Sequence, residues 1–149
     1  MGGDEPAQEG CFLCHAAAET GAPAGHVVER TGDTITLLNR FPYNSGHVMV
    51  APRRHAPDLL SLDDSEAAVL VAAVRRAVRA IVAALRPDGY NVGVNAGDAA
   101  GASVDHLHVH VVPRWSGDTN FMPVLADAKV LPEHLDATAL KLREAYSTL

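Results

Sequence analysis

Three histidines alternate with apolar residues in the segment DHLHVHVVPRW, residues 105–115. Successive side chains of a strand point to opposite faces, so His106, His108 and His110 are expected to share one face while the residues between them pack on the other. Neighbours on the same face stand roughly 6.5 to 7 Å apart along the backbone, so their imidazoles can reach into one site. A buried imidazole needs partners for both nitrogens, and three on one face have no packing rationale. The pattern therefore favours a metal site or a nucleophile with supporting groups.

The segment just before these histidines, GDAAGAS at residues 97–103, consists mostly of small residues. Its backbone N–H groups can approach an anion closely, and Ser103 adds a hydroxyl. Neutral imidazole is the available nucleophile near pH 7, and a hydrogen bond at its far nitrogen fixes the attacking tautomer. A loop of this kind directly before three histidines favours nucleophilic chemistry.

Two cysteines, Cys11 and Cys14, are the only ones in the sequence and have the spacing of a zinc half-site. Because no second CxxC exists, histidines would have to supply the remaining ligands. A redox dithiol is an alternative interpretation, and two cysteines without a joint role are another. In a cytoplasmic protein, two close cysteines favour metal or redox chemistry over a structural disulfide.

The composition describes an ordinary globular protein of 149 residues, with 48% hydrophobic residues, 20% charged residues and a net charge of −6. This charge leaves no basic footprint, so nucleic acid is not an expected partner. No apolar run reaches the length of a membrane span and the N-terminus lacks a signal pattern, so we expect a cytoplasmic protein without a membrane partner. Residues 1–10 are expected to form a disordered lead-in, and residues 11–149 a single domain.

The hydrophobic pattern predicts both strands and helices. We expect strands over 26–40, 46–52, 90–97 and 106–115, and a short additional strand over 121–125. The clearest helix runs from about Ser65 to Arg86, where Pro87 ends it, and a second helix is expected over 131–147. Hairpin-length links and segregated helices predict an α+β fold on a mainly antiparallel sheet, with one long central helix and a C-terminal helix.

The heptad HLHVHVV matches the His-φ-His-φ-His-φ-φ signature, where φ is apolar, and so resembles the histidine triad (HIT) superfamily of nucleotide hydrolases and transferases. LLNRFPYNSGHVMVAPRRH resembles the N-terminal half of that family, and GYNVGVNAGDAAGASVDHLHVHVVPRWSGDTNF the C-terminal half. With the helix between them, the resemblance covers roughly Cys11 to Phe121. LLNR and VPRWSGDTNF are most similar to the fragile-histidine-triad branch and its dinucleoside-polyphosphate phosphorylase relatives. The resemblance implies a HIT-like fold and a homodimer.

The resemblance also implies roles for individual residues. His108 would attack the α-phosphorus and carry a covalent nucleotidyl group, while His110 would support the phosphate and the leaving group. The implied nucleotide- or phosphate-binding positions are Asn39 at the ribose hydroxyls, His47 near the triad, Asn95 at the phosphate, and Gly101 and Ser103 in the phosphate-binding loop. For His47, a histidine that merely finishes a turn is the other interpretation.

Zinc-bearing members of the family, and galactose-1-phosphate uridylyltransferases, resemble the cysteine pattern found here. By that resemblance His55 in PRRH and His106 would join Cys11 and Cys14 in a structural Cys2His2 zinc site. His108 would then remain free for chemistry, and no catalytic metal would be required.

These expectations lead to an enzyme that transfers a nucleotidyl group from a dinucleoside polyphosphate, such as diadenosine tetraphosphate, or a related nucleoside phosphate ester. The acceptor stays open between phosphate and water, with the likeness of RWSGDTNF favouring phosphate. A regulatory nucleotide-binding module with little turnover is one alternative. A metallohydrolase with all three histidines on one catalytic zinc is another.

Overall fold

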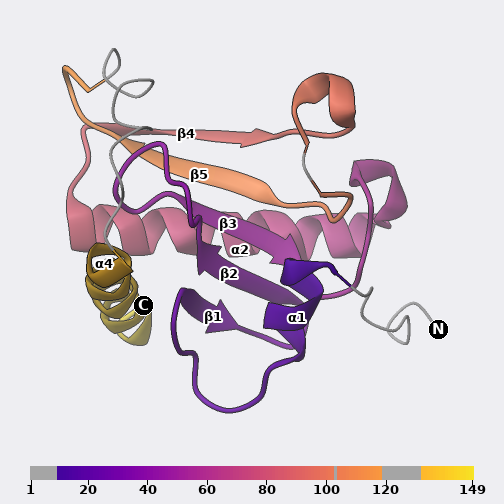
Figure 1. Cartoon of the computed structure of the whole chain (residues 1–149), viewed down its shortest axis with the longest axis horizontal. Coiled ribbons are helices and arrows are strands. Elements are labelled where there is room, and N and C mark those ends of the chain that lie inside the picture. Colours follow the sequence, from indigo (N-terminus) through magenta and orange to yellow (C-terminus); the bar gives the residue numbers. More distant parts are fainter. Residues whose placement is uncertain (1–9, 103, 119–131) are drawn as a thin grey trace.

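A five-stranded antiparallel sheet forms the centre of the protein in a computed structural model, which describes residues 10–102, 104–118 and 132–149. The strands lie in the order β1-β2-β3-β5-β4 (Figure 1). Their bounds are β1 Val27–Arg30, β2 Thr34–Leu38, β3 Val48–Pro52, β4 Gly89–Val94 and β5 Val109–Arg114. The α-helices are α1 Phe12–Ala18, α2 Asp64–Leu85 and α4 Pro132–Ser147, and two short 3-10 helices are η1 Leu59–Ser61 and η2 Asp98–Ala100. The predicted α+β fold is confirmed.

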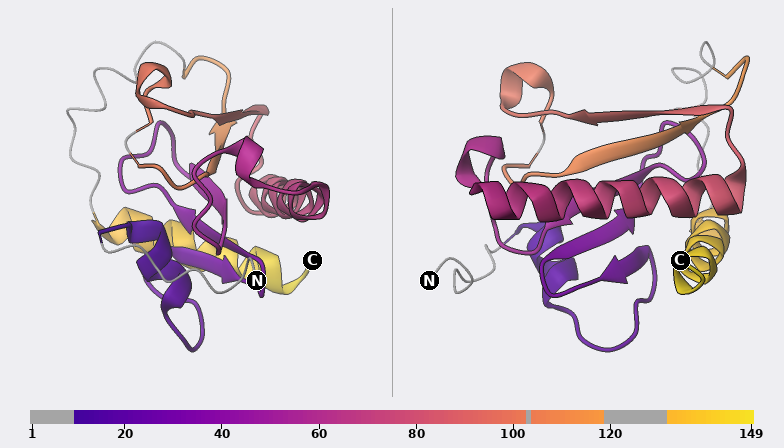
Figure 2. Two further views of the ribbon diagram at one scale, coloured as in Figure 1. Left: turned by 90° about the vertical axis from the view of Figure 1, so that its right-hand side faces the viewer. Right: turned by 180° about the vertical axis from the view of Figure 1, so that it is seen from behind.

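The two faces of the sheet carry different helices. α2 runs along one face, whereas α1 lies on the other (Figure 2). The core beneath α2 and α4 contains Leu107, Val109 and Val111. The opposite face buries Met49 against residues of α1, and Met49 pairs directly with His110 across β3 and β5. The alternation therefore directs the apolar residues to the α2 face and the histidines to the α1 face, as the sequence predicts.

The long helix α2 begins and ends close to its predicted bounds. Asp63 caps its N-terminus by accepting a hydrogen bond from the Glu66 N–H, while the Glu66 carboxylate accepts one from the Asp63 N–H. At the other end Arg86 adopts a left-handed conformation with φ 49°, followed by Pro87. Local capping chemistry thus defines the helix.

Two strand predictions need correction. The single strand expected over 26–40 is wrong, because β1 and β2 form a hairpin whose turn is closed by the Thr31 hydroxyl, which accepts from the backbone N–H of Asp33 and of Thr34. β5 begins at Val109 and not at His106, for a reason given below.

Other predictions meet the fold as follows. The C-terminal helix is confirmed as α4, whereas the expected strand over 121–125 and the first nine residues lie outside the described residues. Among the helices that the structure describes, none has the length and hydropathy needed to cross a membrane.

Candidate active site and metal centre

The segment that leads into β5 leaves the sheet to contact the chain beyond β3. The backbone N–H of Leu107 donates to the Ala56 carbonyl at 2.7 Å, and His106 Nε2 lies 2.8 Å from the Pro52 carbonyl oxygen. A carbonyl only accepts, so His106 carries its proton on Nε2. These contacts replace ladder hydrogen bonds before Val109, which explains why the strand begins after the first two histidines.

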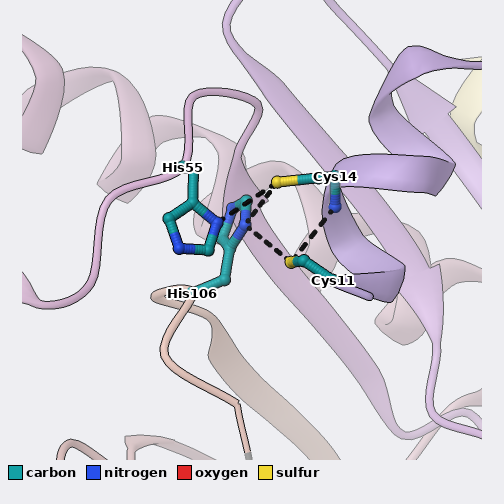
Figure 3. Close-up of side chains that lie close together, drawn as sticks. All are labelled: Cys11, Cys14, His55 and His106. Atoms are coloured by element: carbon teal, nitrogen blue, oxygen red, sulfur yellow. Dashed lines mark hydrogen bonds between the residues drawn. The ribbon is translucent and has the colours of Figure 1, made fainter. Parts of the chain in front are cut away.

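His106 belongs to a buried cluster with Cys11, Cys14 and His55 (Figure 3). Its Nδ1 lies 3.4 Å from Cys11 Sγ and 3.5 Å from Cys14 Sγ, and His55 Nδ1 lies 3.2 Å from Cys14 Sγ. The four ligand atoms all lie within 4.8 Å of one another. Tetrahedral zinc with bonds of about 2.0 to 2.3 Å would separate its ligand atoms by about 3.3 to 3.8 Å, so the cluster needs small adjustments to hold the ion.

The protonation of the cluster also suits a metal. Because His106 donates through Nε2, the lone pair of its Nδ1 faces the two sulfurs. Burial lowers the pKa of His106 below its ordinary value, which favours the neutral, ligating ring. His55 directs Nδ1 at Cys14, and its Nε2 makes no hydrogen bond with the described residues but lies 3.5 Å from the carboxylate of the exposed Asp105. A carboxylate behind a ligating histidine is a common support in zinc sites.

Three separate parts of the chain supply this cluster. Cys11 caps α1, its Sγ accepting from the Cys14 N–H, while His55 follows β3 and His106 precedes β5 (Figure 3). The structure thus brings together all four residues that the family resemblance implied as zinc ligands. A metal here would tie α1 to the sheet.

The middle histidine, His108, is held differently. It is 7% exposed, and its Nδ1 lies 2.7 Å from the carbonyl oxygen of His106. The carbonyl again accepts, so Nδ1 carries the proton and Nε2 keeps its lone pair. One backbone carbonyl therefore presents Nε2 of His108 as the available nucleophilic atom.

The third histidine takes its tautomer from His47. The Tyr43 N–H donates to His47 Nδ1 at 3.0 Å, so the neutral His47 ring carries its proton on Nε2, which lies 2.8 Å from His110 Nδ1. His110 therefore accepts at Nδ1 and carries its own proton on Nε2. Burial, followed by the neighbouring His110 and His108, lowers the pKa of His47 to about 3, and burial also lowers that of His110. Both rings are neutral at pH 7, and His110 Nε2–H is a donor.

Gly46 allows the loop before His47 to approach α2. It has φ 83°, and a Cβ at this position would collide with the Leu85 side chain. Tyr43 in the same loop stacks on the His47 ring with centroids 5.3 Å apart. The loop therefore fixes His47 from both its backbone and its ring face.

Two of the remaining predicted residues, Asn39 and Asn95, lie beside these histidines. Asn39 accepts at Oδ1 from the Phe41 N–H, and its Nδ2 lies 3.5 Å from His47 Nε2. Both of these nitrogens carry hydrogen, so the Asn39 amide remains a donor for a ligand. Asn95 follows β4 and lines a pocket with His110. Gly101 ends η2 in a left-handed conformation, and Ser103 lies outside the described residues.

The sequence reasoning missed a polar network beside β5. Asp118 accepts hydrogen bonds from Asn44, from the Trp115 N–H and from the Arg114 guanidinium, and the Arg114 contact is the largest of the effects that lower the pKa of Asp118 to about 2. Asn44 also donates to the Pro113 carbonyl at 3.0 Å. The network holds the 41–46 loop against the end of β5. Its aspartate lies within the segment VPRWSGDTNF, where the family likeness was the available signal.

The comparisons with known proteins agree with this geometry. The HIT domain family matches residues 21–117. The AP-4-A phosphorylase of Mycobacterium tuberculosis is 48% identical over 115 residues, which cover 76% of this chain but 59% of that protein, so the chain spans about three-fifths of the relative's length.

Solved structures show the same fold. A histidine triad nucleotide-binding protein of Sulfolobus tokodaii superposes with a TM-score of 0.77 at 26% identity, covering 93% of both chains. A zinc-bound histidine triad family protein of Mycobacterium smegmatis superposes with a TM-score of 0.75 at 29% identity, covering 93% of this chain and 94% of that one. The resemblance inferred from HLHVHVV is confirmed, and the chain belongs to the HIT family.

Proposed function

We propose that this protein is an enzyme that cleaves dinucleoside polyphosphates through a nucleotidyl group carried on His108. The observation that carries the proposal is the 2.7 Å contact between His108 Nδ1 and the His106 carbonyl, because it leaves the lone pair on Nε2. The family membership and the similarity to AP-4-A phosphorylase support the substrate class.

The first step forms a phosphorus–nitrogen bond. The Nε2 lone pair of His108 attacks the α-phosphorus, the bond from phosphorus to the bridging oxygen breaks, and its electron pair leaves with the nucleoside polyphosphate. The positive charge that develops on the His108 ring is stabilised by the Nδ1–H bond to the His106 carbonyl. His110 donates from Nε2–H to a phosphate or leaving-group oxygen. Asn39 would bind the ribose, and Asn95, Gly101 and Ser103 the phosphate.

In the second step an acceptor oxygen attacks the same phosphorus, and the electron pair of the phosphorus–nitrogen bond returns to His108 Nε2. We propose inorganic phosphate as the acceptor, because the M. tuberculosis relative is a phosphorylase. Diadenosine tetraphosphate would then yield ADP and ATP, whereas water as acceptor would yield AMP and ATP.

The metal site is proposed to hold a structural zinc ion on Cys11, Cys14, His55 and His106. The supporting observations are the His106 lone pair directed at the sulfurs, the 3.2 Å distance between His55 Nδ1 and Cys14 Sγ, and the burial of all four residues. A bound zinc would supply rigidity, since His106 both belongs to the cluster and provides the carbonyl that orients His108.

A homodimer is proposed from the edge of the sheet. Among the residues that the structure describes, no strand pairs with the outer side of β4, and Tyr90 and Val92 on it are each 49% exposed. Exposed apolar side chains on an unpaired edge favour pairing with a second copy. The mass in solution, from light scattering, tests this arrangement.

Product analysis tests the reaction. The wild-type protein is incubated with diadenosine tetraphosphate, with and without millimolar phosphate, and the nucleotides are separated by chromatography. ADP with ATP supports phosphorolysis, and AMP as the main product in the presence of phosphate would replace it with hydrolysis. The variant His108→Asn should lose turnover by several orders of magnitude while still binding AMP. Nucleotide binding by the wild-type protein without any turnover would favour the regulatory binding module instead.

A further inference from the structure

The pocket that Asn95 and His110 line has a volume of about 390 Å³ and lies over β4 and β5. The two strands are neighbours at the edge of the sheet (Figure 1). Gly93 is directly opposite His110, and Asn91 directly opposite Val112, so these residues share the histidine face. Tyr43 from the loop before β3 also lines the pocket. His110 is among the described residues that line the pocket, whereas His108 is not. The pocket therefore lies on the His110 side of the proposed nucleophile.

Gly93 leaves the pocket open beside the third histidine. Apart from the two residues next to Gly93 in the chain, no atom lies within 4 Å of the place that a Cβ would occupy. The backbone of Gly93 has an ordinary strand conformation. The position is therefore distinguished by the open space beside it. A larger side chain would fill the pocket without forcing the strand to move.

The walls of the pocket offer hydrogen-bond donors. Arg114 Nη1 lies 2.7 Å from Asn91 Oδ1, and because an arginine cannot accept, this contact fixes the amide and leaves Asn91 Nδ2 as a donor. His110 adds its Nε2–H, as derived above. None of the described lining residues is a carboxylate. Two further lining residues, Arg114 and Asn44, already donate to the Asp118 carboxylate. The donors left for a phosphate chain therefore include Asn91 Nδ2 and His110 Nε2.

The neighbouring hollow differs in charge. It has a volume of about 530 Å³, lies beside η2, and is lined by Asp58, Asp98 and Asp105. The proposed phosphate-binding segment also forms one wall, with Asn95, Gly97 and Ala102. Three carboxylates nevertheless disfavour an extended polyphosphate chain there. An extended phosphate chain near the triad is therefore directed towards the β4–β5 pocket.

We propose that the β4–β5 pocket binds the leaving group of the substrate, specifically the phosphate chain of the nucleoside polyphosphate that departs from His108. This inference rests on the proposed function and adds a subsite that selects which nucleoside polyphosphate can leave. An in-line displacement puts the leaving oxygen on the side of phosphorus opposite the nucleophile, and His110 lies at that boundary. Asn91 and Gly93 are then residues that determine which leaving groups are accepted.

Two substrates with the same adenylyl group test the inference. Diadenosine tetraphosphate loses ATP, whereas adenosine 5′-phosphofluoridate loses only fluoride. In Gly93→Val, the ratio of kcat/KM for the tetraphosphate to that for the fluoridate should fall about tenfold or more. Gly89→Val is the matched control, because Gly89 lies on the same face of the same strand opposite Arg114 and its Cβ would likewise meet nothing within 4 Å. In this control the ratio should not change.

The inference would be overturned if this ratio in Gly93→Val equalled the wild-type ratio. That outcome includes an equal fall of kcat/KM for both substrates. The binding of inorganic tripolyphosphate, measured by calorimetry, gives a readout that needs no turnover. Asn91→Asp keeps an oxygen for Arg114 but replaces the donor with a charged acceptor, so it should weaken this binding about tenfold. If the wild-type protein cleaves neither substrate, the proposed function fails. Equal tripolyphosphate affinity in wild type and Asn91→Asp would then overturn the pocket as well, and weakened binding would support it.

Discussion

Acid should destabilise this protein through His47, and the effect can be calculated from its surroundings. The His47 side chain is fully buried, and its pKa in the folded protein is about 3, against an ordinary value of 6.5. Below pH 6.5 the unfolded chain therefore binds a proton that the folded chain does not. The contribution of neutral His47 is complete above pH 6.5 and is lost as the pH falls towards 3. At about 1.4 kcal/mol per pH unit, the total loss is about 5 kcal/mol.

The variant His47→Gln isolates this contribution, because the glutamine does not titrate and retains an N–H donor for His110. Urea unfolding of both proteins from pH 7 to pH 4 gives two curves of unfolding free energy against pH. Carboxylates and the other histidines titrate in both proteins, so they largely cancel in the difference. That difference should change by about 2 kcal/mol between pH 6.5 and pH 4.5, with the wild type losing more.

Parallel curves would refute the reasoning. They would mean that His47 takes up a proton in the folded state as readily as in the unfolded chain, so that its Nδ1 no longer accepts from the Tyr43 N–H. The stability measurement therefore tests the hydrogen bond that holds His47 neutral.

Two further predictions concern the metal. Purified protein should contain about one zinc per chain, and the double variant Cys11→Ser, Cys14→Ser should lose the zinc and melt at a lower temperature. Zinc-free protein from a preparation without chelators would contradict the site. Asp105→Asn should weaken zinc affinity about tenfold in a competition titration with a chelating dye, because the carboxylate beside His55 Nε2 is lost. Asp98→Asn, on η2, is the control, and equal affinities in the two variants would exclude the proposed support.

The sequence predicted those parts of the fold that depend on local periodicity. Alternation directed Leu107 to the α2 core and the histidines to the other face, and helical spacing with local caps located α2. The hairpin between β1 and β2 was missed because its turn is short, closed by the backbone bond from the Thr31 N–H to the Thr34 carbonyl and by the Thr31 hydroxyl, and lies inside a run rich in β-branched residues. His55 was predicted from the family resemblance alone. It lies in the connection between β3 and η1, where no periodic pattern marks it.

The hydrogen-bond partners of His106 and His110 could not be predicted, because they come from distant parts of the chain. Pro52 holds His106 across 54 positions of sequence, and His47 holds His110 across 63. Asp105 likewise carries no local signal, since an aspartate before a buried strand is usually a solvated residue. Its position beside His55 follows from the path of the chain that leads into β5, which is a tertiary feature.

The three histidines differ in chemistry because a different neighbouring group contacts one nitrogen of each ring and decides which nitrogen carries the proton. A carbonyl at Nε2 of His106 leaves Nδ1 for the sulfurs, a carbonyl at Nδ1 of His108 leaves Nε2 for the substrate, and a donor at Nδ1 of His110 leaves a proton on its Nε2. One catalytic zinc bound by all three would need three lone pairs that converge. Here the His106 lone pair is directed at the cysteines, and the ring of His110 offers a proton where a metal would need a lone pair. His106 therefore suits a structural metal, His108 suits nucleophilic attack, and His110 suits a hydrogen bond to phosphate. This division follows from two backbone carbonyls and one neighbouring histidine.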